Sequence, residues 1–107
     1  MSLSITLFQT MPTDVYGANI THNLNEMADA AGIYKHLWRP EELGFTKAGE
    51  LIPGLEIGLA FLLANPGICK AHNPSNGWGK YEDLVAFVND YLEACREFPE
   101  AAISVSR

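Results

Sequence analysis

The sequence predicts an α+β fold in one domain, residues 1–107, with three main helices around a central apolar helix and a short paired strand at each end. The apolar run at residues 51–64 repeats at three- and four-residue steps, which is the period of one helix face. Residues 81–98 carry an apolar stripe of the same period opposite an acidic face. Residues 4–10 and 102–106 instead alternate apolar and polar side chains, which is typical of strands. At 107 residues the chain can bury enough surface to fold without a disulfide or a metal ion.

The first strand is predicted at residues 4–10, ended by the segment 11–14 and followed by a loop at 15–17. A first helix is then predicted from apolar side chains spaced four and three residues apart: Ile20, Leu24, Met27, Ala31, Tyr34 and Trp38. Its start is open, because Asn19 or Thr21 would cap it early, whereas residues 23–26 form an Asn-x-x-Glu capping box that would start it later. Gly32 is a candidate break, and Pro40 ends the helix.

The central helix at residues 51–64 is apolar around most of its circumference, so we expect it to be buried on several sides, with Leu59 deep in the core. Thr46 is a candidate cap, and Pro53 falls near the first or second turn. A span of a bilayer needs about 20 apolar residues, and this run is shorter. Residues 65–67 end the helix, residues 68–72 are expected to form a short helix, and residues 73–79 form the clearest loop.

The last helix has the best-defined stripe, and Pro99 ends it. The two terminal strands are each too short to be stable alone, so we expect them to pair with one another and to pack on the helices.

Charge and composition exclude several classes of function. The chain has 7 Lys and Arg residues against 13 Asp and Glu residues, a formal net charge of −6. Phosphate backbones and anionic membranes repel such a surface, so we expect neither a nucleic-acid partner nor a membrane partner. The start of the chain lacks the basic and apolar regions of a signal peptide, and two cysteines do not make a disulfide scaffold. Both features favour the cytoplasm.

Side chains that could bind a ligand gather in two segments, residues 16–23 and the loop at 73–79. The candidate ligand-binding residues are Asn19, His22, Asn23, Asn76 and Trp78. Amide and imidazole groups donate and accept hydrogen bonds, and an indole ring offers a stacking face. An alternative stays open: Asn and Thr before a helix are ordinary caps, Asn-Gly is a common turn, and Trp is often a packing residue.

Stronger chemical claims need more than the sequence offers. His22 and Glu26 have the spacing of two metal ligands on a helix, but a zinc site usually needs three, so we expect no metal. No nucleophile signature surrounds Cys69 or Cys95, and Cys95 is expected to be a buried free thiol. Neither a P-loop nor a G-x-G-x-x-G motif is present, so no cofactor is expected.

Four segments carry a resemblance: Tyr-Gly-Ala-Asn-Ile-Thr-His-Asn-Leu at 16–24, Ala-Gly-Ile-Tyr-Lys-His-Leu-Trp-Arg-Pro-Glu-Glu at 31–42, Asn-Gly-Trp-Gly-Lys-Tyr-Glu at 76–82, and Tyr-Leu-Glu-Ala-Cys-Arg-Glu-Phe-Pro at 91–99. With the Val-Ser-Arg ending, the chain resembles a group of short bacterial and phage proteins of unknown function. The resemblance covers nearly the whole chain after Tyr16 and implies a bacterial or phage cytosolic protein. It implies no activity, cofactor or catalytic residue.

Three functions therefore stay open for this sequence. The first is a binding module for a small polar ligand, such as a sugar or a nucleoside, held between the two polar segments. The second is a protein-interaction or structural accessory protein, for which a homo-oligomer is one form. The third is a small enzyme that uses His22 as acid or base, which requires a carboxylate or a second titratable group within hydrogen-bond reach.

Overall fold

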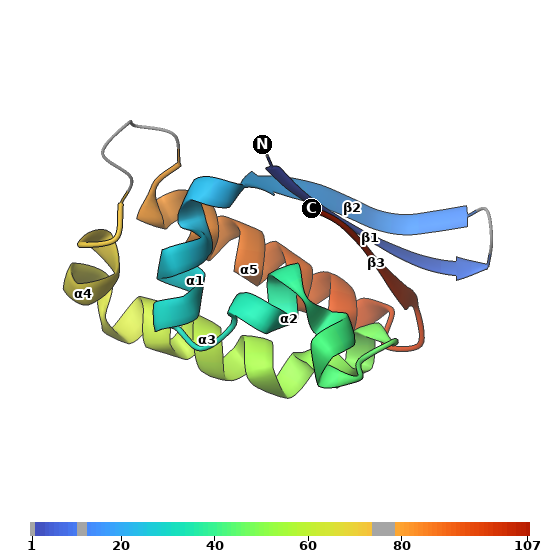
Figure 1. Ribbon diagram of the computed structural model, residues 1–107. Coiled ribbons are helices and arrows are strands. Elements are labelled where there is room, and N and C mark those ends of the chain that lie inside the picture. Colours follow the sequence, from blue (N-terminus) through green and yellow to red (C-terminus); the bar gives the residue numbers. More distant parts are fainter. Residues whose placement is uncertain (1, 11–12, 74–78) are drawn as a thin grey trace.

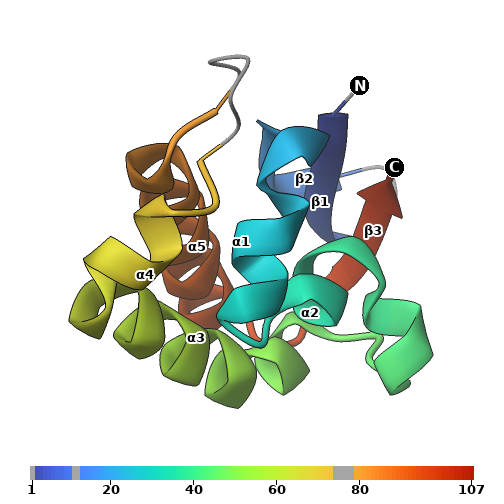
Figure 2. The same ribbon diagram turned by 60° about the vertical axis from the view of Figure 1, so that its left-hand side comes forward.

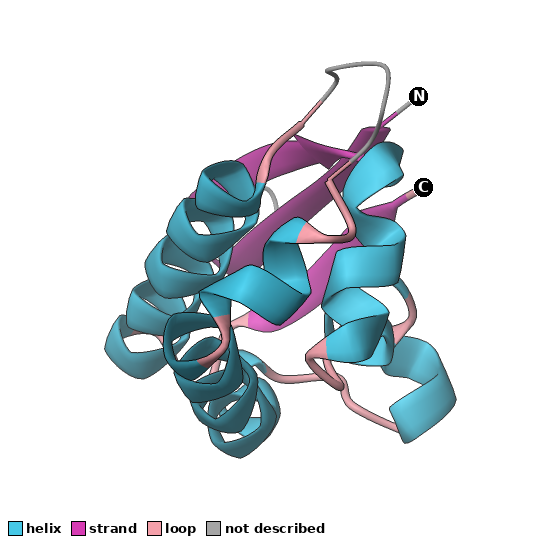
Figure 3. Ribbon diagram, turned by 90° about the vertical axis from the view of Figure 1, so that its left-hand side faces the viewer, coloured by secondary structure: helices cyan, strands magenta, loops and turns pink. Residues whose placement is uncertain are grey.

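The fold is α+β, as predicted: a three-stranded antiparallel sheet is covered on one face by the helices (Figures 1 and 3). It is seen in a computed structural model that describes residues 2–10, 13–73 and 79–107. The strands are β1 (Ser2–Thr10), β2 (Thr13–Thr21) and β3 (Ala102–Ser106), in the order β2-β1-β3. Helix α5 (Tyr81–Glu97) lies between the sheet and helix α3 (Ile52–Ala64), which forms the far side of the molecule (Figure 1).

Strand β1 is the central strand of the sheet and pairs with both β2 and the C-terminal strand β3. Ser4 pairs with Ser106, which confirms that the terminal strands are neighbours. Alternation along β1 separates the two faces, because successive side chains of a strand point to opposite sides. Leu3, Ile5 and Leu7 are buried toward the helices, and the residues between them are partly exposed.

Strand β2 was not predicted, so the expected loop at 15–17 is wrong, and of the helix starts left open the early one capped by Asn19 is excluded because residues 19–21 belong to the strand. Residues 13–21 form a hairpin with β1 instead. Tyr16 and Ala18 pair with Leu7 and Ile5 on the helix-covered side of the sheet, while Gly17 and Asn19 take the intervening positions. Glycine and asparagine are rare in strands, but pairing with β1 and burial of Ile20 outweigh their weak preference.

The first predicted helix is a series of short turns. Residues His22–Leu24 form a 3-10 helix, followed by α1 (Asn25–Ala30), α2 (Tyr34–Trp38) and a second 3-10 turn at Pro40–Leu43. Gly32 has a φ of 78°, a left-handed conformation that a glycine adopts without strain, and this breaks the helix as expected. Thr21 caps the first turn, because its hydroxyl oxygen accepts a hydrogen bond from the Asn23 amide at 3.3 Å.

Helix α3 is less buried than its composition predicts. It follows a 3-10 turn at Ala48–Leu51, and Pro53 lies in its first turn. Leu55 is fully buried and Leu59 only partly, whereas Ile57 is 71% exposed. The expectations that this helix is buried on several sides and that Leu59 is deep in the core are therefore wrong. One face packs on α5 and on the α1–α2 segment, and nothing in the described part of the chain covers the opposite face.

Helix α5 contributes eight buried side chains, and its apolar stripe is confirmed. Its buried side chains contact both the sheet and α3: Tyr81, Leu84, Phe87, Val88, Tyr91, Leu92, Ala94 and Cys95. The Tyr81 hydroxyl donates a hydrogen bond to the Leu62 carbonyl at 2.5 Å, which ties the start of α5 to the end of α3. The short helix α4 (Pro66–Lys70) lies beside this junction (Figure 2). No helix of the described residues combines the length and the apolar character that crossing a bilayer requires.

Candidate functional site

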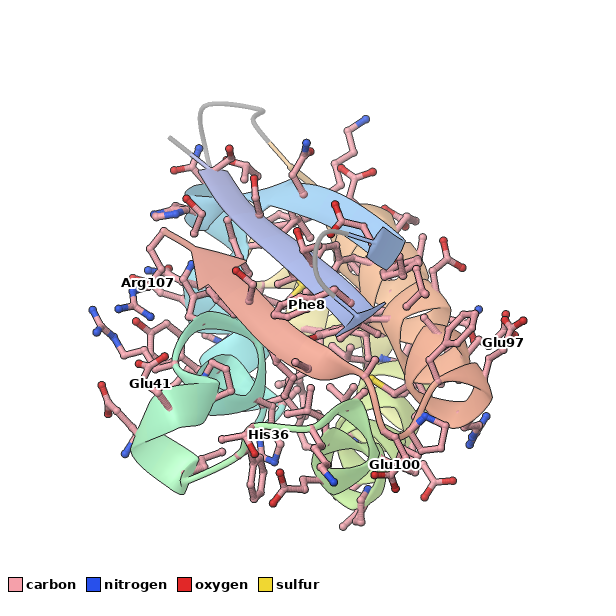
Figure 4. All side chains as sticks on the ribbon, turned by 90° about the vertical axis from the view of Figure 1, so that its right-hand side faces the viewer. Phe8, His36, Glu41, Glu97, Glu100 and Arg107 are labelled. Atoms are coloured by element: carbon pink, nitrogen blue, oxygen red, sulfur yellow. The ribbon has the colours of Figure 1, made fainter. Side chains whose placement is uncertain are left out.

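A cleft of about 440 Å³ lies between the outer strand β2 and helix α5. Figure 4 shows why it forms there: β3, β1, β2 and α5 follow one another across the molecule, so β2 is the edge strand that borders α5. The cleft is lined by residues of β2, by residues of α5 and by Gly79, which precedes α5 in the chain. They are Tyr16, Ala18, Asn19, Ile20, Thr21, Gly79, Asp83, Ala86, Phe87 and Asp90. Its volume is in the range of small-molecule sites.

The α5 wall of the cleft consists of Asp83, Ala86, Phe87 and Asp90. Their spacing of three, four and seven residues places them on one face of the helix. The phenyl ring of Phe87 is nearly buried, and the two aspartates are exposed on either side of it. Asp83 also accepts a hydrogen bond from the Lys80 amide at 3.0 Å, which fixes its carboxylate at the first turn of α5. The α5 wall is therefore apolar in its middle and carries a carboxylate at each end.

Tyr16 connects the two walls electrostatically. Burial raises the pKa of the Tyr16 hydroxyl, and the negative charge of Asp90 raises it further. The Tyr16 ring stacks on Tyr91 of α5 with centroids 6.2 Å apart, and Phe87 meets the same Tyr91 ring at an angle of 60°. The phenol therefore stays protonated beside an acidic group and can donate a hydrogen bond to a ligand.

Gly79 narrows one end of the cleft. Its φ of 96° lies in the region that favours glycine, and a Cβ atom there would approach Cγ2 of Thr21 to 2.6 Å. The backbone at residue 79 can therefore approach Thr21 of β2 this closely only because residue 79 has no side chain. Of the predicted site residues, Asn76 and Trp78 lie outside the described part of the chain.

The structure brings Asn19 to the cleft but does not bring His22 or Asn23 there. The reason is the strand: residues 19–21 are extended, so Asn19 and His22 do not share one flank of a helix. The His22 ring instead meets the Trp38 ring edge-on, with centroids 6.1 Å apart, and its buried Nε2 atom has no hydrogen-bond partner among the described residues. Asn23 is exposed in the first 3-10 turn. The sequence did not indicate the α5 wall, because Asp83 and Asp90 belong to the predicted acidic face of residues 81–98.

Glu26, considered above as a second metal ligand beside His22, lines a different and smaller hollow of about 250 Å³ with Asn25, Asp29 and Tyr34. Within the described residues no group of three or more His, Cys, Asp or Glu side chains could hold a metal ion.

Both cysteines are buried free thiols, as predicted for Cys95. Burial raises the pKa of the Cys69 thiol, and it raises the pKa of Cys95 to about 12. Neither is a thiolate at neutral pH, so neither has the reactivity of a catalytic nucleophile.

The chain matches no protein-family model, and neither a curated protein nor a solved structure is significantly similar to it. The resemblance to short bacterial and phage proteins stays a prediction.

Proposed function

We propose that this chain is a ligand-binding module and that its ligand, a small polar molecule, occupies the cleft between β2 and α5. The observation that carries the proposal is the composition of that cleft: it combines residues Asn19 and Thr21 of the strand edge with the Tyr16 phenol, the Phe87 ring and two carboxylates. Small-molecule sites typically join an apolar wall to a few polar groups that fix orientation.

The lining supports a ligand of the size of a sugar or a nucleoside, and it adds a preference that the sequence did not reveal. Asp83 and Asp90 are both exposed to the cleft, and none of the residues that line it is basic. A ligand with an amino group would offset these charges, whereas a phosphate would be repelled. We therefore favour amino-substituted or otherwise cationic ligands over neutral ones. The buried, unpaired thiols agree with a reducing cytoplasm.

The experiment is a thermal-shift and calorimetric screen of neutral sugars, nucleosides, amino sugars and simple amines. A ligand that binds only the folded state raises the melting temperature by mass action. We expect the amine-bearing compounds to raise it and the neutral ones to do so less. The substitution Ala86→Phe should fill the cleft and abolish the rise in melting temperature. Ala60→Phe, at an exposed position of α3 outside the cleft, is the matched control and should keep it.

A protein-interaction or accessory role is the second candidate, and one observation favours it. Three large apolar side chains on α3 and α4 are more than half exposed: Ile57 at 71%, Leu63 at 59% and Ile68 at 57%. Association with a second copy or another protein would remove these side chains from water, and contiguous apolar surface often marks such a site. Light scattering on the same samples separates the two candidates. A chain that binds no compound of the panel and forms a homo-oligomer would support the second candidate and contradict the first.

An enzyme that uses His22 has the least support. Acid–base catalysis needs a partner group that orients the imidazole, and Trp38 supplies packing but no carboxylate.

A further inference from the structure

The outer edge of β2 borders the cleft, and Gly79 approaches this edge only at Thr21. β2 pairs with β1 on one side, and no strand of the described residues pairs with its other side. In an antiparallel pair, every second residue of an edge strand directs both its N–H and its C=O away from its neighbour. Alternate residues of the segment 16–21, which borders the cleft, therefore direct N–H and C=O groups to the side where no described strand pairs with them.

The opposite edge of the sheet is protected at its start, which makes the β2 edge distinctive. The amide of Ile103 in β3 donates a hydrogen bond to the Thr46 carbonyl at 3.1 Å, and the Ala48 amide donates one to the Ala101 carbonyl at 2.8 Å. Natural sheets commonly cover an edge in this way, because an open edge invites another strand. The β2 edge has a helix beside it rather than a strand on it.

An edge strand with a parallel helix wall is an arrangement that binds extended peptides. The peptide backbone adds to the sheet as a further strand, and alternate side chains of the peptide enter the space beside the helix. Six strand residues span roughly 20 Å, so the segment 16–21 could pair with about five or six residues of a peptide. Asp83 and Asp90 are two turns apart, about 10 Å along α5.

Charge decides which peptide fits. The wall carries carboxylates at both ends and no basic group, and the whole chain has a net charge of −6. Lysine or arginine side chains would pair with Asp83 and Asp90 in charge-assisted hydrogen bonds. The rings of Phe87 and Tyr16 would contact the aliphatic stems of these side chains.

We propose that the ligand of this cleft is an extended basic peptide segment that adds to β2 as a fourth strand and places lysine or arginine side chains against Asp83 and Asp90. This inference rests on the proposed binding function of the cleft, but it replaces the free small molecule with a peptide whose lysine or arginine side chains supply the cationic groups. A free amine would use the two carboxylates but not the edge of β2.

The test uses a fluorescein-labelled, capped hexapeptide of alternating valine and lysine, measured by fluorescence anisotropy with the intact chain. Three further probes are compared: the same peptide with its alternate amides N-methylated in each of the two registers, a peptide with glutamate in place of lysine, and acetyl-lysine amide. We expect the parent peptide to bind, one N-methylated register to bind at least about tenfold more weakly because its hydrogen bonds to β2 are lost, and the glutamate peptide not to bind.

The protein variants test the charge pairing. Asp90→Asn should weaken binding of the parent peptide about tenfold, because it removes one charge-assisted hydrogen bond. Glu93→Gln makes the same change of charge on α5 at an exposed position outside the cleft, so it should leave the affinity unchanged. Asp90 is exposed, so both variants should fold.

Each contrary outcome has a definite meaning. If both N-methylated peptides bind as tightly as the parent, strand addition is wrong, but the cleft remains a binding site. Equal affinity for acetyl-lysine amide would assign the site to small amines instead of peptides. Self-association of the chain that the peptide competes away would make a second copy the occupant. If no peptide and no compound of the small-molecule screen binds, the proposed function fails as well.

Discussion

Gly58 is buried in α3 directly against the Ile33 side chain of the α1–α2 segment. A Cβ atom at residue 58 would overlap Cγ2 of Ile33, so the helix and that segment can approach only because residue 58 is glycine. We expect Gly58→Ala to destabilise the fold by about 1–3 kcal/mol, as overpacking in a core does. This loss would exceed the gain of up to about 1 kcal/mol that alanine brings inside a helix. Urea unfolding followed by circular dichroism measures the difference.

Gly67 provides the matched control. It lies in α4, and a Cβ atom there would meet nothing within 4 Å. Gly67→Ala should therefore leave the stability unchanged or raise it by up to about 1 kcal/mol. If both glycine variants prove equally stable, Ile33 moves aside freely and the contact with α3 is not tight.

The face of α3 that packs on its neighbours should contribute most of this helix's share of the stability. Leu55 is fully buried and Ile57 is 71% exposed, although the two are close in sequence and equally apolar. We expect Leu55→Ala to cost about 2–5 kcal/mol, because it leaves a cavity in the core. Ile57→Ala should change the stability by less than about 0.5 kcal/mol. Equal losses in urea titrations would show that the outer face of α3 is covered in solution, as a homo-oligomer requires.

Among the helices and strands, the sequence predicts correctly those whose apolar pattern is compatible with a single structure. The stripe of α5 is bounded by acidic residues, so its buried face was predictable. Helix α3 is apolar on nearly every side, and no periodicity can tell which side meets the core. Strand β2 was not predicted for another reason. Ile20 fits the three- and four-residue spacing of Leu24 and Met27, although the strand ends at Thr21, between Ile20 and Leu24.

The candidate site was predictable in part for the same reasons. Asn19 was found because amide and imidazole side chains gather near it in the sequence. The α5 wall was not, because Asp83 and Asp90 belong to an acidic face that looks solvent-exposed in isolation. Only the hairpin β1–β2 places an open strand edge beside them, and that arrangement depends on pairing between segments that periodicity does not relate.

The molecule as a whole is closed by strand β3, which brings the end of the chain back to β1. Ile103 and Val105 pair with Leu7 and Ile5, and thus complete the sheet face that covers α5 and the short helices. Deleting residues 102–107 would leave a two-stranded hairpin, which is marginal in water, and would expose the core beneath it. We expect the shortened chain to lose cooperative urea unfolding and the near-ultraviolet circular dichroism of its packed aromatic rings.

Removal of Arg107 alone separates the role of the strand from that of its last side chain. Figure 4 shows Arg107 beside Glu41, and its guanidinium lies 3.1 Å from the nearer carboxylate oxygen and 2.8 Å from the Trp38 carbonyl. Exposed ion pairs contribute about 0–1 kcal/mol, so the chain that ends at residue 106 should stay folded and lose no more than about 1 kcal/mol. A chain without residues 102–107 that keeps the original urea midpoint would contradict the central place of β3, and the packing of α5 against β1 and β2 would then suffice to hold the fold.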